Sequence, residues 1–123
     1  YNELEIGGYL LYHLGPEIKT FIDGRTDMFL PEVFPEAAKL LEPKYANDTS
    51  LTAYFDSLVG KYNISWAIFT KRINSRQWRL ALALSHEPDW ALVFYEGTTA
   101  ILAKRSLLNE SVIKAHEIKA SLL

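Results

Sequence analysis

The densest group of side chains that could do chemistry is the run Asp23-Gly24-Arg25-Thr26-Asp27. Two carboxylates on either side of a guanidinium could transfer protons in acid–base catalysis or hold a metal ion. The same residues have an ordinary structural use, because Asp stabilises turns and Arg forms two-pronged pairs with carboxylates. Two interpretations follow, a ligand site or a pinned turn. We favour the turn and expect Arg25 to pair with Asp23 or Asp27.

Most other enzyme motifs are missing from the sequence. There is no cysteine, which excludes a thiolate zinc site, a disulfide framework and a cysteine nucleophile. The three histidines, His13, His86 and His116, do not have metal-ligand spacing. No nucleophile elbow or phosphate-binding loop occurs, and the pair Gly7-Gly8 lacks the lysine that a phosphate loop needs. We therefore expect no metal and no cofactor in this chain.

Composition predicts one ordinary domain over residues 1–123. Hydrophobic residues make up 49% and charged residues 23% of the 123 residues, close to the globular average. The net charge of -2 argues against a nucleic-acid partner, which usually selects a basic excess. The basic group Lys71, Arg72, Arg76 and Arg79 could contact phosphates or anionic lipid headgroups, and we interpret it as the solvated face of a helix and the loop before it. No apolar run is long enough to span a membrane, no signal peptide is evident, and the chain starts at Tyr1, so we expect a piece of a longer protein.

The hydrophobic pattern indicates nine elements that must position these residues. Helices are predicted over 7–14, 35–41, 50–62, 74–86 and 111–123, and strands over 18–23, 64–69, 90–95 and 99–103. Strands that alternate with helices favour a three-layer, Rossmann-like α/β fold with a mostly parallel sheet of about four strands. Helices are expected on both faces. The last two strands are predicted to form a C-terminal antiparallel hairpin that adds one antiparallel strand at the edge of the sheet. In such sheets ligands bind beyond the carboxyl ends of the strands, where Asp23, Arg25 and Asp27 would lie.

Three Asn-x-Ser/Thr sequons occur, at Asn47, Asn63 and Asn109. Each is common by chance, and Asn is also useful as a cap or turn residue. The sequons matter only if the domain lies outside the cytoplasm, and the sequence leaves open whether they are used.

Two segments resemble a known pattern. Residues 2–12 (NELEIGGYLLY) and 20–28 (TFIDGRTDM) resemble the form N-E-x-x-x-G-G-Y-L followed by F-I-D-G-R-x-D. This pattern follows the last membrane helices of polytopic proteins similar to dolichyl-phosphate-mannose mannosyltransferases and oligosaccharyltransferase-like glycosyltransferases. One departure is Ile6, where the pattern usually has tryptophan. The resemblance covers most of the chain but is specific only in its first 28 residues.

The resemblance implies a non-catalytic extracytoplasmic domain of a membrane-embedded, glycosyltransferase-like protein. Catalytic carboxylates of these families lie in loops between membrane helices, so none is carried over to this chain. The implied partners are the protein's own transmembrane region and, through it, a lipid-linked sugar or acceptor. A free-standing α/β ligand-binding or enzyme domain using Asp23, Arg25 and Asp27 stays open as an alternative. A second alternative that stays open is a protein-interaction module that binds its partner through the segment over 111–123.

Overall fold

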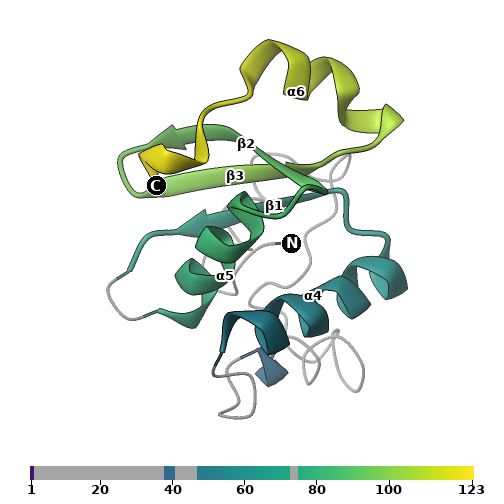
Figure 1. Ribbon diagram of the computed structural model, residues 1–123, viewed down its shortest axis with the longest axis vertical. Coiled ribbons are helices and arrows are strands. Elements are labelled where there is room, and N and C mark those ends of the chain that lie inside the picture. Colours follow the sequence, from purple (N-terminus) through teal and green to yellow (C-terminus); the bar gives the residue numbers. More distant parts are fainter. Residues whose placement is uncertain (2–37, 41–46, 73–74) are drawn as a thin grey trace, which may run out of the picture.

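The computed structural model describes residues 1, 38–40, 47–72 and 75–123, and everything below concerns these residues. Figure 1 shows a sheet with helices on both sides. In chain order the elements are α4 (Asp48–Tyr62), β1 (Trp66–Thr70), α5 (Arg76–Ser85), β2 (Trp90–Glu96), β3 (Thr99–Lys104), η2 (Leu107–Asn109), α6 (Glu110–His116) and η3 (Ala120–Leu122). The predicted helix over 7–14 and strand over 18–23 lie outside the described residues, as does most of the predicted helix over 35–41.

The described sheet has the strand order β1-β3-β2, and both of its ladders are antiparallel. Trp66 pairs with Ala103 on one side of β3, and Trp90 pairs with Lys104 on the other. The predicted Rossmann-like, mostly parallel sheet of about four strands is therefore wrong. Since β1 and β2 are both antiparallel to β3, they run in the same direction without being neighbours.

The hairpin explains this difference. β2 and β3 are joined through Gly97 and Thr98, and Gly97 takes the positive φ of 61° that such a tight turn favours. The hairpin over 90–103 is thus confirmed, but its second strand is not at the edge as expected. Helix α5 connects β1 to β2, and the two strands run in the same direction. The connection leaves space for one strand between them. β3 fills that space and so forms hydrogen bonds with a strand on each side.

Helices α4 and α5 cover one face of the sheet, as Figure 1 shows below the strands. The apolar stripe predicted over 50–62 is confirmed, with Phe55 fully buried and Leu51 and Leu58 almost so. Asn47 caps α4 by accepting a hydrogen bond from the Ser50 backbone nitrogen at 2.8 Å, so the helix begins two residues before the predicted start. The buried side chains of this layer are the main core.

Helix α6 covers part of the opposite face through Ile113, which packs against Ala91 and Ala103. The helix predicted over 111–123 begins near the expected place but ends at His116. Residues after it are extended, and the Ile118 backbone nitrogen donates to the carbonyl of Leu92 at 2.8 Å. A hydrogen bond to the outer edge of β2 thus replaces a continued helix.

Asn109 anchors the start of α6 to the ends of two strands. Its Nδ2 donates to the carbonyl oxygen of Ser65 at 2.7 Å and to that of Lys104 at 2.9 Å. The Lys104 backbone nitrogen also donates to the Ser65 carbonyl, at 2.9 Å. The side chain does not cap the helix, although it occupies the N-cap position. Asn109 therefore acts as a donor that joins β1, β3 and α6.

Tyr1 lies along the edge of β1 that faces away from β3. Its amino group donates to the Trp66 carbonyl, and its carbonyl accepts from the Ile68 nitrogen at 2.9 Å. Its ring meets that of Phe55 edge-on, with centroids 5.4 Å apart. When the chain begins at Tyr1, burial lowers the pKa of its amino group to about 5, because a charged ammonium is poorly solvated there.

Candidate functional site

The residues singled out in the sequence lie outside the described part of the chain. They are Gly7, Gly8, Asp23, Arg25 and Asp27. The pairing expected for Arg25 stays a prediction, and so does the alternative ligand site. A candidate site can be built only from the described residues, chiefly those of the sheet and of α4, α5 and α6.

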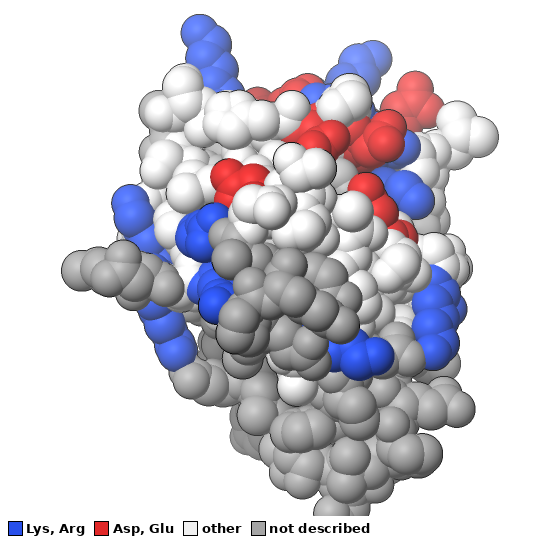
Figure 2. Space-filling model, turned by 60° about the horizontal axis from the view of Figure 1, so that its bottom comes forward, with Lys and Arg blue, Asp and Glu red and all other residues white. Residues whose placement is uncertain are grey.

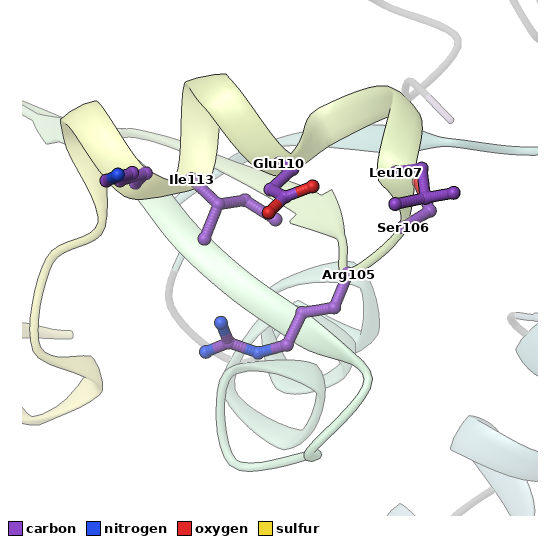
Figure 3. A pocket seen from close by; sticks show the side chains of 6 residues that line it. Arg105, Ser106, Leu107, Glu110 and Ile113 are labelled. Atoms are coloured by element: carbon purple, nitrogen blue, oxygen red, sulfur yellow. The ribbon is translucent and has the colours of Figure 1, made fainter.

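A shallow depression of about 490 Å³ lies between the end of β3 and helix α6. In Figure 3, Glu110 and Ile113 extend from the helix and Arg105 lies across the opening from them. Its lining residues are Arg105, Ser106, Leu107, Glu110, Ile113 and Lys114. Ile113 is buried and gives an apolar floor, while charged side chains form the rim. Such a surface can hold a small group with one apolar and one charged side.

Arg105 is engaged by a carboxylate that follows α6. Both terminal guanidinium nitrogens donate to the carboxylate of Glu117. These hydrogen bonds raise the pKa of Arg105 and lower the pKa of Glu117, and the attraction of the two charges adds to both effects. Ser106 supplies the hydroxyl of the depression, and no described carboxylate or imidazole is hydrogen-bonded to it. The pair of Arg105 and Glu117 thus joins the end of β3 to the segment that follows α6.

A second group joins a cation to two aromatic rings. Lys71 Nζ lies 5.8 Å from the centroid of the Trp78 ring and 3.4 Å from the Tyr95 hydroxyl oxygen. The two ring centroids are 6.2 Å apart. Trp78 is buried, so the group attaches the end of β1 to α5 and β2 and presents little aromatic surface to a ligand.

The rest of the predicted basic face also has intramolecular contacts. Arg79 forms an ion pair with Asp48 at 3.1 Å, linking α5 to the first turn of α4. Arg72 and Arg76 are likewise engaged in interactions. On the face shown in Figure 2, the described Lys and Arg side chains are scattered, some at the outline and others inside it, and Asp and Glu gather in its upper part. The basic residues thus serve the fold more than an anionic ligand.

Sequence reasoning missed one pair of carboxylates. Partial burial raises the pKa of Asp56 in α4; the nearby charge of Asp89 raises it further, and Lys104 opposes both effects. Asp89 immediately precedes β2, far from Asp56 in the sequence. No spacing pattern could have brought the two together, because only the packing of α4 below the sheet does so.

The three sequon asparagines take different places in the fold. Asn47 and Asn63 flank α4 and are exposed, whereas Asn109 is half-buried. Asn63 ends α4 in the left-handed conformation, with φ 54°. The roles of Asn47 and Asn63 match the expectation that Asn serves as a cap or turn residue, whereas the Asn109 side chain bonds to two strand ends and does not cap α6.

The described residues contain no cluster of three or more metal-ligating side chains. None of the described helices has both the length and the apolarity to cross a bilayer. Comparisons of the chain with protein-family models, with curated proteins and with solved structures found no match.

Proposed function

We propose that this chain is a non-catalytic, extracytoplasmic domain of a membrane-embedded, glycosyltransferase-like protein. The observation that carries the proposal is the two-segment resemblance of residues 2–12 and 20–28. The domain would bind its own transmembrane region and, through it, meet a lipid-linked sugar or acceptor. On this proposal its role is to dock and to shape the surface that the substrate approaches.

The described charged groups support a structural role. The ion pairs Arg79–Asp48 and Arg105–Glu117 each connect two segments of the fold. Lys71 is held between Trp78 and Tyr95. Side chains used in this way join segments of the fold, which is a structural use of their charge.

The first test is the reading frame that encodes the parent protein. We expect several apolar segments of about 20 residues upstream of this chain. A parent without them would overturn the proposal.

The second test locates the domain relative to the membrane. Because this chain has no cysteine, an introduced thiol can report its surroundings. In a parent cleared of its other cysteines, Glu96→Cys should react with a membrane-impermeant maleimide added to intact cells, since Glu96 is exposed in the hairpin. Ala100→Cys is the matched control, because Ala100 is fully buried. Labelling of Glu96→Cys only after lysis would contradict the extracytoplasmic location.

The variant Arg25→Ala separates this proposal from a ligand-binding domain. A structural Arg25 paired with Asp23 or Asp27 predicts a loss of about 2–5 kcal/mol in the free energy of unfolding. Urea unfolding measures this loss. A variant that unfolds like the parent chain but no longer binds inorganic phosphate or a carboxylate would favour the ligand site instead.

A further inference from the structure

The structure distinguishes the three sequons by what each asparagine amide is doing. Asn63 is exposed, and in the described part of the chain its side chain has no hydrogen-bond partner. Its backbone ends α4 by donating to the Val59 carbonyl. Asn is one of the few residues that accept the left-handed conformation found here, so the residue suits its position through its backbone while its amide stays available.

We propose that Asn63 is an attachment site for an N-linked glycan. The inference rests on the proposed function, because the sugar donor is met on the extracytoplasmic side. The co-reactant is a lipid diphosphate-linked oligosaccharide, and an oligosaccharyltransferase of the host catalyses the step. The Asn63 Nδ2 forms a bond to the anomeric carbon of the sugar, the bond from that carbon to the phosphate oxygen breaks, the lipid diphosphate leaves, and Nδ2 loses one proton.

Asn109 shows why a sequon alone does not make an asparagine a glycan attachment site in the folded chain. Its Nδ2 has two hydrogens, and both are donated, one to Ser65 and one to Lys104. A glycan replaces one of these hydrogens, so at least one bond is lost. The sugar would also have to leave a half-buried position between α6 and the ends of β1 and β3. A folded molecule with a glycan at Asn109 is therefore disfavoured.

Asn47 is an intermediate case. It caps α4 with Oδ1, which accepts from the Ser50 nitrogen, and a glycan on Nδ2 leaves that oxygen in place. The two exposed sequons can thus be modified without breaking a described hydrogen bond, and the half-buried one cannot.

The test removes each sequon through its hydroxyl residue and keeps all three asparagines. The 123-residue chain is secreted from eukaryotic cells behind a cleavable signal, and the folded monomer is weighed by intact mass spectrometry before and after enzymatic glycan removal. The variants are Ser65→Ala for Asn63, Ser111→Ala for Asn109 and Thr49→Ala for Asn47. We expect Ser65→Ala to lose one glycan mass increment and Ser111→Ala to lose none. Thr49→Ala assigns any increment at Asn47.

An unchanged number of glycans in Ser65→Ala, including the case in which no chain is glycosylated, would overturn the proposal. A folded monomer from which Ser111→Ala removes an increment would contradict the argument that separates Asn63 from Asn109 by their hydrogen bonds, because a glycan at Asn109 would then be compatible with the fold. The added signal delivers the chain regardless of its parent, so this result is independent of the thiol-labelling test of the proposed function.

Discussion

Substituting Asn by Asp at positions 47 and 109 distinguishes a side-chain amide that accepts a hydrogen bond through its oxygen from one that donates through its nitrogen. At Asn109 the nitrogen donates to two backbone carbonyls, so a carboxylate loses both hydrogen bonds and places an oxygen against them. At Asn47 the oxygen accepts from the Ser50 nitrogen, and a carboxylate can do the same. The same chemical change should therefore destabilise the chain at Asn109 and leave it nearly unchanged at Asn47.

The magnitude follows from the contacts. A net contribution of about 1 kcal/mol for each hydrogen bond gives about 2 kcal/mol for Asn109→Asp, and the oxygen–oxygen repulsion adds to it. The Ser65 carbonyl keeps the Lys104 nitrogen as a donor, so the loss stays well below that of a buried, unpaired charge. Asn47→Asp should change the free energy of unfolding by less than about 0.5 kcal/mol, because the two residues are equivalent N-caps.

Urea unfolding followed by tryptophan fluorescence measures both variants against the parent chain. With a slope of roughly 2 kcal/mol per molar urea, Asn109→Asp should lower the midpoint by about 1 M. Asn109→Ala serves as a second variant, since it removes the donor without adding repulsion, and should be the milder of the two. Equal midpoints for Asn109→Asp and Asn47→Asp would refute the assigned donor role.

Three further measurements examine the core, the amino group and the surface. Phe55→Ala should lower the free energy of unfolding by about 3–5 kcal/mol, because Phe55 is fully buried; a loss under about 1 kcal/mol in a urea titration would contradict its place in the core. In the chain that starts at Tyr1, the amino group has a pKa of about 5 when folded and 8.0 as its ordinary value. The folded state then binds fewer protons between these values, so its stability is complete above pH 8 and falls by up to about 4 kcal/mol toward pH 5. Acetylation of Tyr1 should flatten this part of the pH profile, and an unchanged profile would argue against a buried amine. An NMR titration should find the pKa of Glu117 below its usual range, and Arg105→Gln should raise it; the same value in both proteins would show that the pair does not form in solution.

Local features of the fold were predictable where short-range chemistry decides them. The stripe that contains Phe55 and Leu58 follows from helical spacing, and the Ser75 cap follows from a hydroxyl just before the helix. The hairpin follows from two apolar runs separated by a turn at Gly97. Each of these signals depends on residues only a few positions apart.

The sheet order and the polar contacts depend on distant residues and were not predictable. Alternating strands and helices fix the relative direction of β1 and β2 but cannot tell whether a later strand lies between them. The position of Asn109 in the sequence predicts a helix cap, yet its amide donates to the Ser65 carbonyl. Only the antiparallel ladder brings that carbonyl near Asn109. Asp56 and Asp89 likewise meet through packing. The candidate site predicted around Arg25 stays untested.

The central position of β3 also decides when the sheet can form during synthesis of the chain. Of the three described strands it is the last to leave the ribosome, so neither β1 nor β2 can complete its ladder until Thr99–Lys104 has been made. Until then the two earlier strands have unpaired backbone N–H and C=O groups along the edges that later pair with β3, and such open edges favour aggregation. The pairing of Trp66 with Ala103 then requires closure of a long loop, which slows folding relative to the local hairpin. A nascent chain that pauses before residue 99 is consequently the one most in need of a chaperone.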